Sequence, residues 1–173
     1  IVWIGTTRGI SIYNPLQQKF VQNFLPGVNG HANTLYDFYT DDNGRMLIGS
    51  SRGIYTKDSK SGDMQLHPLT YKGEKLAVTK FFHSPDNVLY IGTNVSLFRL
   101  NEQDFTVTPL PHTEKDIVMK RIIESRVVSI VTDTIENHPV ILVSPYGHYL
   151  AYYDLVTQHW VSRQDSTRDI IKN

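Results

Sequence analysis

Seven histidines are the side chains of this sequence with the most obvious capacity for chemistry. None is paired at i and i+4 with a glutamate beside it, which is the pattern of a catalytic zinc helix. Most lie in or beside expected turns, which favours histidines at the protein surface: His31, His67, His83, His112, His138, His148 and His159. We therefore expect no metal site.

The acidic turn Asp41-Asp42-Asn43-Gly44 faintly resembles a calcium-binding loop. Counted from the glycine, however, the first ligand position falls on Tyr39 and the closing glutamate position falls on Ser50. Asn-Gly is also the preferred pair of a two-residue type I′ hairpin turn, because both central residues need positive φ. We predict a type I′ hairpin at Asn43-Gly44 instead of a calcium site.

Composition removes several other function classes. The 173 residues include no cysteine, so there is no disulfide framework, thiolate metal site or thiol nucleophile. Lys+Arg and Asp+Glu balance at 17 each, which excludes the basic field expected of a nucleic-acid partner. No Gly-x-Ser-x-Gly elbow or phosphate-cradling glycine loop occurs. We expect no catalytic residues and no cofactors.

The pattern that organises the chain is a repeat of an apolar run, a turn and a second alternating run. The first copy reads Trp-Ile-Gly-Thr-Thr-Arg-Gly-Ile-Ser-Ile-Tyr-Asn-Pro from Trp3. Later copies carry the same marker position, which is Gly5, Gly49, Gly92 and Ser144, spaced 44, 43 and 52 residues apart. Each copy predicts two antiparallel strands. A period in the low forties with several short strands per unit is typical of a β-propeller blade.

The first copy, followed by Phe20 six residues after Asn14, resembles the two-component regulator propeller repeat. That repeat builds the sensor region of bacterial hybrid two-component regulators. The same six-residue offset separates Asp154 from Trp160, and it separates Asp58 from Met64. The likeness covers nearly the whole chain. Two departures are Val95, where the third copy lacks the second glycine, and Ser144, which replaces the marker glycine.

We predict an all-β fold, a β-propeller of about four blades of four-stranded antiparallel sheets. The units span residues 1–30, 31–73, 74–111 and 112–162, and 169–173 begins a further strand. The chain starts inside an apolar strand, and the first unit lacks the strand expected before Val2. Both features suggest a segment of a larger propeller.

The expected strands of the first three units are 2–4, 10–13 and 20–24, then 35–40, 46–48, 54–57 and 65–69, then 78–82, 88–91, 97–100 and 105–110. Phe38, Phe81 and Ile130 align as equivalent core positions, and the marker glycines are expected at points of close packing. The fourth unit is longer, with extra residues in the loop 111–126 and in the turn 134–139.

Five aromatic residues at recurring strand positions could be a sugar-stacking platform or core packing between blades. Because most recur with the repeat, we favour core packing for Trp3, Tyr13, Phe20, Tyr153 and Trp160.

One candidate ligand site remains. In a propeller, the turn after the second strand of each blade opens on the same face as the loops between blades. Four residues occupy that turn in the successive units: Arg8, Arg52, Asn94 and Tyr146. Converging donors and an aromatic ring would suit a polar ligand. The alternative is that the two arginines only cap their turns or pair with neighbouring carboxylates.

The resemblance implies a non-catalytic, ligand-sensing segment that recognises an oligosaccharide and signals to a histidine kinase elsewhere in the chain. It also implies a periplasmic location within an inner-membrane-anchored sensor. The expected partners are the oligosaccharide, the remaining blades and signalling domains, and a further copy in a homo-oligomer. The alternatives are a propeller that binds another protein and, third, a propeller lyase, for which no recurrent set of catalytic histidines or acids is present.

Overall fold

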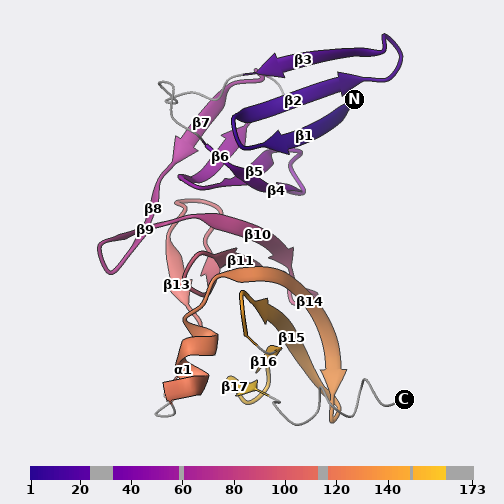
Figure 1. Ribbon diagram of the computed structural model, residues 1–173. Helices are drawn as coiled ribbons and strands as arrows, with labels where there is room; N and C mark the ends of the chain where they lie inside the picture. Colours follow the sequence, from indigo (N-terminus) through magenta and orange to yellow (C-terminus); the bar gives the residue numbers. More distant parts are fainter. Residues whose placement is uncertain (24–32, 59–60, 113–116, 149, 163–173) are drawn as a thin grey trace. The chain divides into compact units, whose positions relative to one another are not determined.

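The computed structural model describes residues 1–23, 33–58, 61–112, 117–148 and 150–162 (Figure 1). The chain divides into two compact units, residues 1–81 and 82–173. The boundary falls inside strand β10 (Val78–His83).

The first unit is built from antiparallel sheets. One sheet has three strands in the order β1 (Val2–Thr6), β2 (Gly9–Asn14) and β3 (Lys19–Asn23). The next has four, in the order β4 (Leu35–Thr40), β5 (Met46–Ser50), β6 (Gly53–Lys57) and β7 (Met64–His67). A separate hairpin joins β8 (Leu69–Tyr71) to β9 (Glu74–Leu76).

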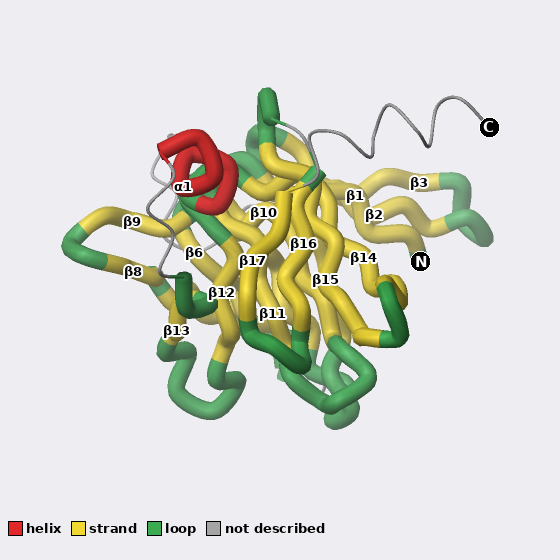
Figure 2. The backbone as a smooth tube through the Cα atoms, turned by 90° about the horizontal axis from the view of Figure 1, so that it is seen from below, coloured by secondary structure: helices red, strands yellow, loops and turns green. Residues whose placement is uncertain are grey.

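The second unit contains the later repeats. One four-stranded sheet has the order β10, β11 (Leu89–Thr93), β12 (Leu97–Leu100) and β13 (Val107–Pro109). The last sheet has β14 (Val127–Ile135), β15 (His138–Pro145), β16 (Ala151–Asp154) and β17 (His159–Ser162) side by side (Figure 2). The one helix among the described residues is α1 (Ile117–Ile123), just under two turns long. An all-β fold of four-stranded antiparallel sheets is therefore confirmed.

Within each unit, neighbouring sheets contact each other, β1 with β4 and β11 with β14, and their central strands are apolar on both sides. Every residue of β11 is buried, and so are four of the five residues of β5. Ile48 and Tyr55 on one face of their sheet pack with Ile10 and Leu35 in a shared core. A strand covered on both faces has no reason to alternate apolar and polar residues, which explains the unbroken run around Leu47.

The marker glycines permit this close stacking, as expected from their repetition. A Cβ at Gly49 would lie 2.7 Å from the Val78 backbone oxygen, and a Cβ at Gly92 would lie 2.7 Å from Val127 Cγ1. A Cβ at Gly5 would lie 3.1 Å from Leu35 Cβ. The nearby side chains include the three residues aligned as equivalent core positions: Phe38, Phe81 and Ile130.

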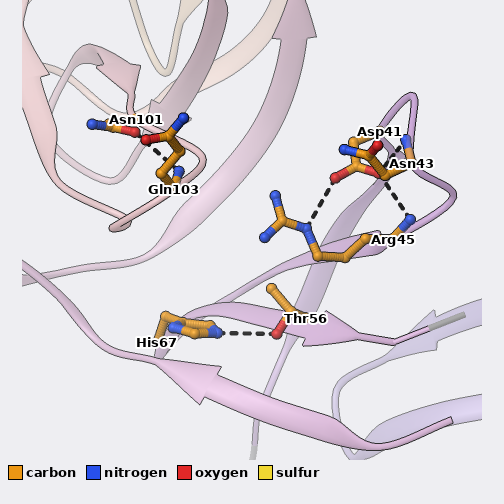
Figure 3. Close-up of polar contacts among 7 residues, drawn as sticks. All are labelled: Asp41, Asn43, Arg45, Thr56, His67, Asn101 and Gln103. Atoms are coloured by element: carbon orange, nitrogen blue, oxygen red, sulfur yellow. Dashed lines mark hydrogen bonds and ion pairs between the residues drawn. The ribbon is translucent and has the colours of Figure 1, made fainter. Parts of the chain in front are cut away.

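The repeated Asn or Asp that ends the second strand of each motif closes an outer turn. Its side-chain oxygen accepts backbone N–H groups two or three residues later, as in an Asx-turn. Asn101 accepts from Gln103 at 2.9 Å (Figure 3), and Asp154 accepts from Val156 at 2.8 Å. The same bonds form at Asn14 and Asp58. The six-residue spacing in the sequence, as from Asp154 to Trp160, therefore corresponds to one Asx-turn and the start of the next strand.

The predicted type I′ turn at Asn43-Gly44 is wrong. Only Gly44 has positive φ, at 76°, and its N–H donates to the Asp41 carbonyl at 2.9 Å. The Asp41 carboxylate also accepts the Arg45 side chain at 2.9 Å (Figure 3). A buried carboxylate that organises its own turn favours this longer hairpin loop, with the glycine in the left-handed region, over a two-residue loop.

The predicted six-residue turn at 134–139 is also wrong. Strands β14 and β15 extend into it, pairing Thr134 with Pro139 and Ile135 with His138. The connection is only Glu136-Asn137, and both residues have positive φ, at 51° and 64°. The extra residues lengthen the hairpin instead of the loop.

Two further differences concern packing and the chain after β7. Phe20 is 67% exposed and packs on Tyr13 with ring centroids 4.7 Å apart, so it is not a core residue. The hairpin β8–β9 was not predicted, although its turn Lys72-Gly73, with both residues at positive φ, carries a glycine signal. The predicted Phe24 strand end, the predicted strand at 169–173 and His31 lie outside the described residues.

Candidate ligand-binding turns

Hydroxyl side chains, not arginines, close the turns that carry the predicted site. The Thr6 hydroxyl donates to the Gly9 carbonyl at 2.8 Å and accepts the Arg8 backbone N–H at 3.1 Å. The Ser50 hydroxyl does the same with Gly53 and Arg52, at 3.0 and 3.1 Å. Because the backbone of each arginine completes the turn, closing it does not require the guanidinium.

Thr93 closes the third such turn, donating to the Ser96 carbonyl at 2.8 Å and accepting the Val95 N–H at 3.1 Å. By these bonds, Val95 lies at the position of Arg8 and Arg52 in their turns, and Ser96, not Val95, takes the place of the second glycine. The turn depends on the hydroxyl group of the residue after the marker glycine, which is Thr6, Ser50 or Thr93. The fourth copy has Ser144 at the marker position and Pro145 after it, and its turn is closed differently.

Asn33, which is fully buried, joins the two arginine turns of the first unit. Its backbone N–H donates to the Thr7 carbonyl at 3.2 Å, and it forms an isolated bridge with Arg8. Its side-chain oxygen accepts the Ser51 hydroxyl at 3.1 Å, and its side-chain N–H donates to the Tyr55 hydroxyl at 2.9 Å. Arg8 and Arg52 are therefore held on neighbouring turns by one satisfied polar network.

Tyr55, at one end of this network, has a buried side chain. Burial raises the pKa of the Tyr55 hydroxyl, while the positive charge of Arg52 and the hydrogen bond from Asn33 act in the opposite direction. The phenol therefore stays protonated at neutral pH and keeps its polar contact with the amide. The charge of Arg52 lies close enough to be felt by this buried group.

Asn94 and Tyr146 occupy the corresponding turns of the second unit. Asn94 is exposed, and the Ser96 hydroxyl two residues later donates to the Ile123 carbonyl at the end of α1, at 2.9 Å. Tyr146 is 71% exposed, and its backbone N–H donates to the Arg126 carbonyl at 2.7 Å. The long segment predicted as the loop 111–126 thus contains a helix, and its last part contacts both turns.

The structure therefore brings the predicted residues together in two pairs, one in each unit. Arg8 and Arg52 are joined through Asn33, and Asn94 and Tyr146 are joined through the segment after α1. Sequence reasoning missed Asn33 and Tyr55. The signal for Tyr55 was its place in the repeat, whereas Asn33 follows a breaker-rich stretch and carries no pattern of its own.

The histidines form polar contacts in the described part of the chain. His67 lies 3.0 Å from the Thr56 hydroxyl (Figure 3), and burial followed by the charge of Arg45 lowers its pKa. His138 bonds Asp154 at 2.7 Å. The described residues contain no cluster of three or more histidine or acidic side chains that could hold a metal ion. No described helix is both long and apolar enough to span a membrane.

Comparison with solved structures identifies the fold class. The chain is similar to the extracellular domain of BT3049 from B. thetaiotaomicron, described as a hybrid two-component system, with a TM-score of 0.64 and 16% identity over 92% of this chain. It is also similar to the extracellular domain of BT4673 from B. thetaiotaomicron, described as a one-component system, with a TM-score of 0.66 and 17% identity over 97% of this chain. Both neighbours are extracellular domains of bacterial regulatory systems, and the propeller repeat that this sequence resembles builds the sensor region of such systems.

The matched region is a small part of each neighbour. This chain covers 19% of the BT3049 domain and 21% of the BT4673 domain, so it spans about a fifth of their length. No protein-family model matches the sequence, and no curated protein matches it. At such low identity, the comparison shows a shared fold.

Proposed function

We propose that the chain is a segment of a β-propeller in the sensor region of a two-component system, and that it binds an oligosaccharide without catalysing a reaction. The segment would lie outside the cytoplasm, in the periplasm, and pass its signal to a histidine kinase elsewhere in an inner-membrane-anchored parent chain. The extracellular domains with a similar fold support this assignment, because they belong to signalling systems.

The observation that carries the ligand site is the Asn33 network. Asn33 has no exposed surface, and hydrogen bonds of its backbone N–H with Thr7 and of its side-chain oxygen with Ser51 connect the turn of Arg8 to the turn of Arg52. A rigid base of this kind limits the backbone conformational entropy that the turns of the two arginines lose when a ligand binds. The planar guanidinium fork suits carboxylates and hydroxyl groups, both of which an oligosaccharide can offer.

Binding should therefore depend on both arginines. In the complete sensor, we expect Arg8→Ala with Arg52→Ala to weaken oligosaccharide binding at least about tenfold, as for the loss of two charge-assisted contacts. A glycan array on the complete extracellular region would first supply the ligand, and titration calorimetry would then compare the variants. Lys19→Ala, which removes an exposed cation at the opposite end of the β1–β3 sheet, is the matched control. Unchanged affinity and signalling with an intact fold would reject these turns as the site.

A second candidate is a surface that docks another protein, favoured by α1. Ile117 and Val118 are exposed apolar side chains on this helix, whose end contacts the turn of Asn94 and is followed by Arg126, which contacts the turn of Tyr146. Exposed apolar side chains beside polar turns resemble a protein interface more than a sugar site. Replacing both by serine should abolish signalling in this case and leave glycan binding unchanged. The double arginine variant should then signal like the parent.

A further inference from the structure

An open surface cavity of about 640 Å³ lies in the second unit, with every described lining residue except Leu155 exposed, and no step of the proposed function uses it. Its described lining residues come from the turn after β10, from the paired ends of β14 and β15, and from the turn after β16. They are Pro85 and Asp86 after β10, Thr132, Asp133, Thr134 and Pro139 of the β14–β15 hairpin, and Leu155 after β16. In antiparallel sheets, these segments lie at the end of the strands opposite to the turns of Asn94 and Tyr146. The cavity is therefore separate from the candidate ligand-binding turns.

The walls of the cavity are positioned by backbone bonds. The turn before β11 is closed by Asn87, with φ at 63°, whose N–H donates to the Ser84 carbonyl at 3.0 Å. On the other side, Leu155 donates its N–H to the Pro139 carbonyl at 3.1 Å, which attaches the β16–β17 turn to the long hairpin. The lengthened β14–β15 hairpin supplies four of the seven lining residues.

The chemistry of the lining is one-sided. Asp86 and Asp133 bring two carboxylates, and the threonines bring hydroxyls, while no lysine, arginine or histidine is among the lining residues that the structure describes. Asp133 accepts the Thr134 N–H at 2.7 Å, which occupies one of its two oxygens. The remaining walls are Pro85, Pro139 and Leu155. The site thus combines negative charge with apolar surface.

This combination selects among ligands. An anion would meet two carboxylates with no compensating cation in the lining, which is unfavourable. A sugar ring usually stacks on an aromatic side chain, and none of the described lining residues is aromatic. An alkyl chain can lie on the two prolines and Leu155, with a positive end group bonded to a carboxylate. A primary ammonium or guanidinium on a chain of several methylenes fits these requirements.

We propose that this cavity binds an organic cation with an alkyl body, through Asp86 and Asp133 at its charged end or ends and Pro85, Pro139 and Leu155 along its chain. The same chemistry is offered by a free alkyl diamine and by an arginine or lysine side chain of a polypeptide. Neither source depends on the oligosaccharide site, so the two proposals succeed or fail separately.

The test is an NMR titration of the ¹⁵N-labelled 173-residue chain with agmatine, which carries a guanidinium and an ammonium on four methylenes. We expect saturable shifts of the amides of Asp86, Thr132, Asp133, Thr134 and Leu155, and weaker binding at higher salt. A parallel titration with N-acetylarginine amide separates the sources. Tighter binding of agmatine indicates a free diamine, and tighter binding of the arginine amide indicates a polypeptide side chain.

The charge requirement is tested with the double variant Asp86→Asn and Asp133→Asn. The half-saturating concentration should rise about fivefold or more, as for the loss of two exposed charge interactions. Asp42→Asn is the control, because it removes an exposed carboxylate from the corresponding hairpin turn of the first unit. An unshifted thermal melt and unchanged amide positions elsewhere would show that each variant is folded.

Three results would overturn the proposal. The first is no shift of the lining amides with agmatine up to tens of millimolar. The second is equal binding by the double Asp→Asn variant and the parent. The third is equal binding of pentan-1-ol at the same amides, since this would show an apolar crevice without charge selection.

Discussion

At the residue scale, the marker glycines have different neighbours and should respond differently to added volume. At Gly92 the obstruction is the Val127 side chain, with Cγ1 at 2.7 Å and Cβ at 2.9 Å from an added Cβ. At Gly49 it is the Val78 backbone oxygen at 2.7 Å. A side chain can be shortened by mutation, whereas a backbone oxygen cannot.

We therefore expect Gly92→Ala and Gly49→Ala each to lower the free energy of unfolding by about 1–3 kcal/mol, as for overpacking of a core. Adding Val127→Ala should recover part of the loss at Gly92, while Val78→Ala should recover less at Gly49, because it removes only the Cγ1 contact at 3.2 Å and leaves the backbone oxygen in place. Denaturant unfolding of the two double-mutant cycles measures both couplings. Equal couplings in the two cycles would contradict this description of the contacts.

Asp154 should make stability depend on pH. Burial raises the pKa of this carboxyl, but the hydrogen bond from His138 and those from Thr157 and Val156 outweigh it, so its pKa falls to about 2. A carboxyl whose folded pKa lies below its unfolded value of about 4 stabilises the fold above that value. The contribution is lost as the pH falls from about 4 to about 2.

Asp154→Asn should consequently cost about 1 kcal/mol at pH 7 and almost nothing near pH 2. Asn101 closes the corresponding turn of the preceding sheet with an amide, so the variant should keep the turn and lose only the charge. Urea unfolding of both proteins between pH 2 and pH 7 gives the difference. A cost independent of pH would mean that the carboxylate acts only as a turn cap.

At the element scale, most strands could be predicted from the repeat, and the errors fall in particular connections. Strand pairs around Gly5, Gly49 and Gly92 follow from apolar runs joined by a hydroxyl-closed turn. The turn at Asp41 differs from the predicted type I′ turn, although Asn-Gly favours that turn. The Asp41 carboxylate, two residues before Asn43, accepts the backbone N–H groups of Asn43 and Arg45 and so determines the turn. The β14–β15 hairpin was mistaken because Glu136 is not a usual residue at positive φ.

The candidate site was predictable only in part for a similar reason. The repeat identifies the turns of Arg8 and Arg52, because their spacing is written in the sequence. The contact that joins them depends on Asn33, which is distant in sequence from both Thr7 and Ser51. The cavity beside Asp86 depends on the extended β14–β15 hairpin. The sequence pattern predicts a loop at 134–139, where the two strands in fact continue.

Two aromatic residues of the first sheet should separate packing from exposure. Trp3 is half-buried against the core of Ile10, Leu35, Ile48 and Tyr55, whereas Phe20 lies on an exposed position. We expect Trp3→Ala to cost about 2–3 kcal/mol, below the value for a fully buried aromatic residue, and Phe20→Ala to cost less than about 1 kcal/mol. Thermal and denaturant unfolding measure both. Similar losses, or a Trp3 variant that melts like the parent, would contradict this placement.

At the scale of the whole molecule, one face of the first sheet is apolar and exposed. Val2, Tyr13 and Phe20 are in register across the three strands, and Val2 and Phe20 are 51% and 67% exposed. Among the described residues, β1 also pairs with β2 alone, which leaves its other edge open. In β5 and β6, by contrast, four of the five residues of each strand are buried. An exposed apolar face and an open edge are both sites of association.

The 173-residue chain should therefore self-associate as its concentration rises, and this face should be responsible. Val2→Lys with Phe20→Lys should shift the equilibrium toward monomer, because two charges cannot be buried without partners. Leu16→Lys, which adds the same charge in the turn between β2 and β3, should leave association unchanged. Multi-angle light scattering across a concentration series, with an apolar-surface dye as a second readout, makes the comparison. A monomer at every concentration with little dye binding would instead favour a closed four-bladed ring, in which another segment of the chain pairs with β1 and covers the face of Val2 and Phe20.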